Sequence, residues 1–354
     1  MLHRSFDRWT IPRHHGAVKS RAEGRAYMTQ AGGWQHEKRS LPDGAFLRLS
    51  RWRAPGTETG VPLLLLTGRS ECVEKYAEVA GDLAAQGFRV VAMDWRGQGG
   101  SARPLANPLK GHIDRFDTYL DDLEASLPHL LGDTGAGPVL ALAHSMGGHL
   151  LLRYVAERAH PFTAVMVSAP MLGIRTSPLP APLARLLAAT MVAIGRGGDY
   201  APGQRDWYAA DPAFDGNPLT SDPVRFLVGH RCYVAQPDLA LGGATWGWLD
   251  AAFRSMAHLR RPDILGQVRI PVLLLSGLAD RIVRPNSHVQ AARFLPNCRL
   301  RQYPTARHEL LMESEAIRAE VMAEISDFAR HMVAHPEQAA NHPLPGDSSP
   351  VNMS

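Results

Sequence analysis

The stretch of sequence that decides the fold is Val139-Leu140-Ala141-Leu142-Ala143-His144-Ser145-Met146-Gly147-Gly148. Its first five residues are apolar, which favours a strand buried on both faces of a parallel sheet. A serine follows among small residues, and the apolar spacing over residues 150–155 predicts a helix directly afterwards. A serine on such a strand-to-helix turn is typical of a nucleophile elbow, whose usual pattern is G-x-S-x-G with Ala143 here in place of the first glycine. The alternative is a glycine-rich helix start of the phosphate-binding kind.

The same alternation of strands and helices extends on both sides of this turn. Apolar runs predict strands at residues 62–67, 88–93, 163–168, 271–275 and 299–303, and helical periodicity predicts helices near residues 73–84, 116–130 and 317–332. This order indicates an α/β protein with a mainly parallel, doubly wound sheet. Residues 1–40 are polar and are expected to be irregular.

The alternation stops between about residues 172 and 248, which are rich in Pro, Gly, Trp and Tyr. An insertion of this kind is typical of a lid or cap. We therefore expect a basic extension at 1–33, a core formed by 34–171 and 249–334, a helical cap at 172–248 and a disordered tail at 335–354.

A serine needs a general base that a carboxylate orients. Asp280 follows the predicted strand at 271–275, and His308 follows the one at 299–303, so both sit at strand ends in the order Ser, Asp, His. The competing candidates fit less well. Asp250 and Asp263 do not follow a core strand, and His288 lies inside a predicted helix.

An oxyanion hole requires two backbone N–H groups. We expect one from Met146, directly after the serine, and one from Arg69 in the glycine-containing loop after residues 62–67. For the Arg69 side chain we expect an ordinary exposed loop charge, with contact to an anionic substrate group as the alternative. The turn Asp94–Ser101 lacks the spacing of a dinucleotide fingerprint, and we interpret it as structural, held by Asp94 and Arg96.

Composition narrows the function class. The chain has 354 residues, 45% of them hydrophobic, and a formal net charge of +4. Residues 1–54 carry 11 Lys and Arg against 4 Asp and Glu, whereas the rest carries 27 against 30, so the body lacks the basic surface of a nucleic-acid-binding protein. The three cysteines form no disulfide framework or metal pattern, and no secretory signal or membrane span is visible. A cytoplasmic location is expected, with no metal or cofactor.

Several further stretches resemble one known family. They are residues 67–69, 74–78, 94–101, 111–123, 143–148, 168–171, 242–246 and 308–309. Together, over residues 34–333, the sequence is similar to α/β-hydrolases of the monoacylglycerol lipase and bacterial lysophospholipase branch. The Thr67-Gly68-Arg69 loop resembles the lysophospholipase form more closely, because monoacylglycerol lipases usually carry His-Gly there.

The resemblance implies a serine esterase that cleaves a single-chain glycerolipid through an acyl-enzyme, with a cap and no cofactor. A lysophospholipid is the expected substrate. The alternatives are a monoacylglycerol lipase or a general carboxylesterase and, in a different class, a non-catalytic binding protein. Leu183, Leu187 and Met191 lie on an apolar stretch of the cap and are candidates to contact the acyl chain, although they could only pack on the core. The cap or the basic N-terminus is also a candidate for peripheral contact with the inner membrane.

Overall fold

The computed structural model describes residues 32–55, 60–135 and 137–337. Within these residues, eight strands form one sheet in the order β1-β2-β4-β3-β5-β6-β7-β8. They are β1 (Gly33–Ser40), β2 (Phe46–Arg53), β3 (Val61–Leu66), β4 (Phe88–Met93), β5 (Leu140–His144), β6 (Ala164–Ser168), β7 (Val272–Gly277) and β8 (Cys298–Tyr303). β1 and β2 pair antiparallel, β2 joins β4 antiparallel, and all other neighbours pair parallel. The α/β-hydrolase fold expected from the sequence is confirmed.

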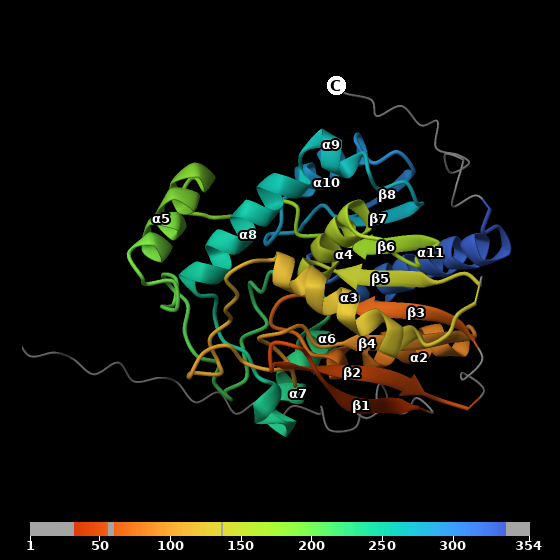
Figure 1. Ribbon diagram of the computed structural model, residues 1–354, viewed down its shortest axis with the longest axis horizontal. Coiled ribbons are helices and arrows are strands. Elements are labelled where there is room, and N and C mark those ends of the chain that lie inside the picture. The colour runs from red at the N-terminus through yellow and green to blue at the C-terminus, as the bar shows by residue number, and fades with distance from the viewer. Residues whose placement is uncertain (1–31, 56–59, 136, 338–354) are drawn as a thin grey trace, which may run out of the picture.

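Helices cover both faces of this sheet. The helices of the described residues, those of the sheet layers and those beyond them, are α2 (Ala77–Ala85), α3 (Asp117–Leu131), α4 (Met146–Glu157), α5 (Ala181–Ala193), α6 (Pro223–Phe226), α7 (Val228–Ala235), α8 (Trp246–Leu259), α9 (Pro262–Leu265), α10 (Pro285–Ala292) and α11 (Glu315–Ala334). Short 3₁₀ turns lie at η1 (Val73–Tyr76), η2 (Pro237–Leu239) and η3 (Leu310–Met312). In Figure 1, α3 and α4 lie in front of the sheet and α11 lies behind it.

The core forms where the sequence is most uniformly apolar. All four leucines of β3, Leu63–Leu66, are fully buried, and every residue of β5 and β6 is buried. Because a central parallel strand is covered on both faces, it tolerates side chains of one kind on both sides. This is why the leucine run is a reliable strand signal.

The amino-terminal hairpin was not expected. Residues 33–40 form β1, so the prediction that all of 1–40 is irregular is wrong, and β2 is a strand that the periodicity did not reveal. Among the described strands, β1 lies at the edge of the sheet and pairs only with β2, and nearly all its side chains are exposed. A strand without a buried face carries no alternation of apolar residues, so the usual signal is missing.

The parallel strands all end at one edge of the sheet, and the functional loops gather there. The chain between β6 and β7 includes α5 to α9, and α5 (green in Figure 1) stands out from the end of the molecule toward which β5 points. The expected cap boundary at 248 falls within α8, which begins at Trp246. The predicted segment 1–33 lies, apart from Gly32 and Gly33, outside the described residues, as does 335–354 apart from its first three residues. Within the described ranges, no helix is both long and apolar enough to cross a bilayer.

Candidate active site

Ser145 lies at the sharp turn between β5 and α4. Its backbone has φ 50° and ψ −114°, a left-handed conformation that side-chain-bearing residues rarely adopt. Gly147 sits so close to the end of β3 that a Cβ there would lie 2.5 Å from the Thr67 carbonyl oxygen. A Cβ on Gly148 would lie 3.1 Å from Pro170. The small residues of the motif are therefore required by the close approach of strand and helix.

The structure brings together the three residues that the sequence selected as nucleophile, base and acid. His308 Nε2 lies 2.9 Å from Ser145 Oγ, and His308 Nδ1 lies 2.7 Å from Asp280 Oδ2. Ser145, Asp280 and His308 are all buried, at 8%, 1% and 4% exposure, and come from the ends of three different strands. This arrangement can pass a proton from a hydroxyl to an imidazole whose charge a carboxylate stabilises.

The Asp280 carboxylate is held in place from its other side. Its Oδ1 accepts the backbone N–H groups of Ile282 at 2.7 Å and Val283 at 3.0 Å. Burial alone would raise the pKa of Asp280, but the hydrogen bond to His308 and these two backbone donors lower it below its ordinary value. Asp280 is therefore ionised and oriented at neutral pH.

The two expected oxyanion donors flank the serine. Met146 is the first residue of α4, so its N–H has no acceptor within the helix. The loop after β3 also approaches the serine, since a Cβ on Gly68 would lie 3.2 Å from Ser145 Cβ. The Gly68 N–H is already bound by the Glu71 carboxylate, which leaves the N–H of Arg69 as the next donor along this loop.

A buried ionic cluster supports the Gly68–Glu71 loop and was not predicted from the sequence. Lys75 Nζ lies 2.6 Å from Glu71 and 2.7 Å from Glu309, and Gln98 Nε2 donates to the Gly68 carbonyl oxygen at 2.7 Å. Burial would raise the pKa of Glu71, but the Lys75 ammonium outweighs it and holds that pKa at about 2. Two features of the sequence pointed to this cluster. Lys75 is one of few lysines in the chain, and Glu309 directly follows His308.

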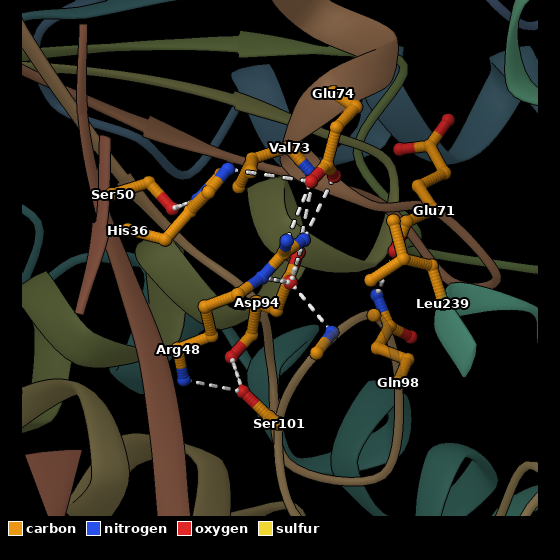
Figure 2. A network of polar contacts seen from close by, with 12 residues as sticks. His36, Arg48, Ser50, Glu71, Val73, Glu74, Asp94, Gln98, Ser101 and Leu239 are labelled. Atoms are coloured by element: carbon orange, nitrogen blue, oxygen red, sulfur yellow. Dashed lines mark hydrogen bonds and ion pairs between the residues drawn. The ribbon is translucent and has the colours of Figure 1, made fainter. Parts of the chain in front are cut away.

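The turn after β4 has the structural role expected of it. Asp94 Oδ2 binds Arg48 Nε at 2.6 Å, and Asp94 accepts the backbone N–H groups of Val73 and Gly100 (Figure 2). Arg48 also pairs with Glu74, at 2.8 Å from Nη2. Arg96 instead holds Asp122 through two hydrogen bonds of 2.9 and 2.7 Å. The turn is thus fixed against β2 through Arg48, and Gln98 within it binds the loop beside the serine.

A cavity of about 650 Å³ opens onto Ser145 and His308. Its apolar wall includes Trp248, Phe253 and Leu187, so one of the three cap residues predicted to contact substrate lines it. Leu183 and Met191 do not line it. The Leu183 side chain faces solvent and is 49% exposed, and Met191 packs against the hydrophobic core. Sequence spacing could not show which side of α5 faces the cavity. The expectation of a membrane contact through the cap stays a prediction.

The side chain of Arg69 differs from the expected exposed loop charge. It is partly buried in the same cavity, with its guanidinium carbon 5.0 Å from the Trp248 ring and Nη2 donating to the Gly242 carbonyl oxygen at 3.1 Å. Burial lowers the pKa of Arg69 to about 10. The sequence could not reveal this environment, because both partners lie more than 170 residues away along the chain.

The competing acids and base have other roles. Asp250 pairs with Arg254 on α8 at 2.9 Å, and Asp263 pairs with Arg261 at 2.6 Å. His288 lies in α10, where its Nδ1 contacts Ser276 Oγ at 2.7 Å and its Nε2 contacts the Pro170 carbonyl oxygen at 2.8 Å. None of the three lines the cavity at Ser145.

Comparisons with known proteins agree with this architecture. Residues 61–315 match the family described as serine aminopeptidase, S33. Lysophospholipase L2 of Escherichia coli is 33% identical over 296 residues, which cover 80% of this chain and 83% of that protein. A probable lysophospholipase L2 of Haemophilus influenzae is 30% identical over 267 residues, covering 75% and 82%.

A solved structure extends the comparison to three dimensions. A soluble variant of monoglyceride lipase from Saccharomyces cerevisiae superposes with a TM-score of 0.65 and 19% identity, covering 86% of this chain and 98% of that one. At this identity the likeness shows the fold alone. The family match and the two bacterial relatives carry the assignment: the chain belongs to the serine aminopeptidase S33 family of α/β-hydrolases, in its lysophospholipase and monoglyceride lipase branch, and is a carboxylic ester hydrolase.

Proposed function

We propose that this protein hydrolyses the acyl ester of a single-chain glycerophospholipid, with Ser145 as nucleophile, His308 as general base and Asp280 as the orienting acid. The observation that carries the proposal is the continuous hydrogen-bond chain from Asp280 through His308 to Ser145 at the floor of a 650 Å³ cavity. That volume is ordinary for a small-molecule site. The similarity to two proteins named as lysophospholipase L2 supports the choice of substrate.

Acylation begins when Ser145 Oγ attacks the ester carbonyl carbon and its proton moves to His308 Nε2. The negative charge then develops on the former carbonyl oxygen, where the N–H groups of Met146 and Arg69 stabilise it. Asp280 stabilises the imidazolium cation. When the tetrahedral intermediate collapses, His308 returns the proton to the glycerol oxygen, which leaves as the alcohol.

Deacylation repeats these steps with water as the nucleophile. His308 Nε2 takes a proton from a water molecule, whose oxygen attacks the acyl carbon on Ser145. Collapse of the second tetrahedral intermediate breaks the bond between the acyl carbon and Ser145 Oγ. His308 Nε2 then gives its proton to Ser145 Oγ. The fatty acid departs and the free serine is restored.

The test is hydrolysis by purified protein of a lysophospholipid, a monoacylglycerol and a short nitrophenyl ester, each compared with Ser145→Ala. We expect the variant to lose at least about 10⁴-fold in kcat on every substrate, because the nucleophile is absent while the rest of the site is intact. Circular dichroism should show an unchanged fold. A fluorophosphonate probe should label the Ser145 peptide of the wild-type protein alone. Substantial ester hydrolysis by the variant, or labelling elsewhere, would refute the assignment of Ser145.

A further inference from the structure

The Arg69 guanidinium makes few hydrogen bonds for a group that is partly buried. Of its five N–H donors, Nη2 donates to the Gly242 carbonyl oxygen at 3.1 Å. Its Nε is buried and has no hydrogen-bond partner among the described residues. The guanidinium carbon also lies 5.0 Å from the centre of the Trp248 ring. A partly buried cation whose buried Nε donor has no acceptor is unfavourable unless a ligand supplies one.

The arginines that are buried in the described residues show how a guanidinium is paired inside this protein. Each of them pairs with two or more carboxylates. Arg48 binds Glu74 and Asp94 (Figure 2), Arg153 binds Asp117 and Glu157, Arg225 binds Glu78, Asp222 and Glu315, and Arg318 binds Glu78 and Asp82.

Arg69 has no such carboxylate within the described part of the chain. Arg103 also lacks a carboxylate there, but its guanidinium donates to the carbonyl oxygens of six residues. The two carboxylates that line the cavity with Arg69 are those of Glu71 and Glu309, and both bind Lys75. Arg175 and Arg281 also line the cavity, but both are exposed to solvent. Arg69 is therefore the partly buried positive group among the described lining residues that an anionic ligand can pair with from inside.

We propose that the Arg69 guanidinium binds the head-group phosphate of the substrate and thereby selects phosphate-bearing single-chain glycerolipids over uncharged ones. This inference rests on the proposed function. A guanidinium presents a planar set of donors that matches two phosphate oxygens, and such charge-assisted hydrogen bonds are the strong ones. The backbone N–H of the same residue is the expected oxyanion donor, so one residue would contact both the reacting ester and the phosphate three carbons away along the glycerol.

The experiment compares two substrates that share the same short acyl chain, lysophosphatidylglycerol and monoacylglycerol, below their micelle-forming concentrations. The quantity measured is the ratio of kcat/KM for the phosphate-bearing substrate to kcat/KM for the uncharged one. Both pass through the same tetrahedral oxyanion, so a shift of the Arg69 backbone cancels in the ratio. We expect the ratio to exceed one in the wild-type protein and to fall about 10- to 100-fold in Arg69→Gln. Arg69→Lys should retain part of the preference.

A matched control is available on the surface. Arg205 also lies over an aromatic ring, 4.6 Å from Tyr208, but it is exposed and does not line the cavity. Arg205→Gln should leave the ratio within twofold of wild type. Binding of a non-hydrolysable ether analogue of the lysophospholipid to Ser145→Ala, measured by calorimetry, should weaken about tenfold when Arg69→Gln is added.

The outcomes separate the two proposals. If wild type hydrolyses both substrates but prefers the uncharged one, or if Arg69→Gln leaves the ratio within twofold, Arg69 does not recognise the phosphate and the hydrolase assignment stands. If wild type hydrolyses neither substrate, or if Ser145→Ala hydrolyses both, the proposed function fails and this inference fails with it.

Discussion

Replacing Asp280 with asparagine should disable the site through a single misplaced proton. The Oδ1 atom accepts two backbone N–H groups, from Ile282 and Val283, so only an oxygen can occupy that position. The amide of Asp280→Asn must therefore turn its NH₂ group toward His308 Nδ1, where Oδ2 now lies at 2.7 Å. Because an NH₂ group donates, His308 would carry its proton on Nε2 and could no longer accept the proton of Ser145.

The expected loss follows from this wrong tautomer. An asparagine in place of a triad aspartate lowers kcat by about 10⁴-fold in a serine protease with the same arrangement, which corresponds to roughly 5 kcal/mol. We expect a similar loss here in steady-state hydrolysis of a nitrophenyl ester at pH 7.5. The urea unfolding midpoint should change little, because the asparagine keeps the shape and both backbone hydrogen bonds.

Asp250→Asn serves as the matched control. Asp250 is also a buried aspartate, but it pairs with Arg254 on α8 and does not line the cavity. Its activity should stay within about threefold of wild type. If Asp280→Asn retained more than a tenth of wild-type activity, the inference that Asp280 sets the tautomer of His308 would be wrong.

Two further predictions concern stability. Burial lowers the pKa values of His144 and His149 to about 3 and that of His288 to about 4, so these groups stay neutral in the fold while the unfolded chain protonates near pH 6.5. Their stabilisation is complete above pH 6.5 and is lost as the pH falls toward 4, by about 2 kcal/mol per histidine between pH 7.5 and 5. Burial raises the pKa of Asp94 to about 6, which offsets a smaller part of that loss in the same window. Urea midpoints at pH 7.5, 6 and 5 should fall in that order, and an unchanged midpoint at pH 5 would contradict this. Separately, Lys75→Met should destabilise the protein by about 3 kcal/mol or more, because two buried carboxylates lose their shared cation. A urea midpoint equal to that of wild type would show that the cluster contributes no stability.

The sequence was most informative where structure depends on neighbouring residues. The elbow at Ser145, the leucine strand β3 and the placement of Asp280 and His308 after strands are all local patterns. Each strand from β3 to β8 lies within one or two residues of its predicted bounds. The triad candidates could be selected because parallel strands end at a common edge, so residues after those strands meet. No contact needed to be known in advance.

The features that escaped prediction depend on distant contacts. β1 has no buried face and exists through pairing with β2. Arg69 looks like a loop charge until Trp248 and Gly242 are brought beside it. The cavity wall combines residues from several separate segments, and of the three residues chosen from the spacing within α5 only Leu187 lines it.

The strained backbone of Ser145 sets stability and activity against each other at one residue. A side-chain-bearing residue at φ 50° and ψ −114° raises the free energy of the native state by about 1–3 kcal/mol, whereas glycine adopts this region freely. A glycine there would relieve the strain and lose the hydroxyl, so the more stable chain would be the inert one. Selection for thermal stability alone would therefore favour loss of the nucleophile, and only selection for turnover keeps a serine in the turn.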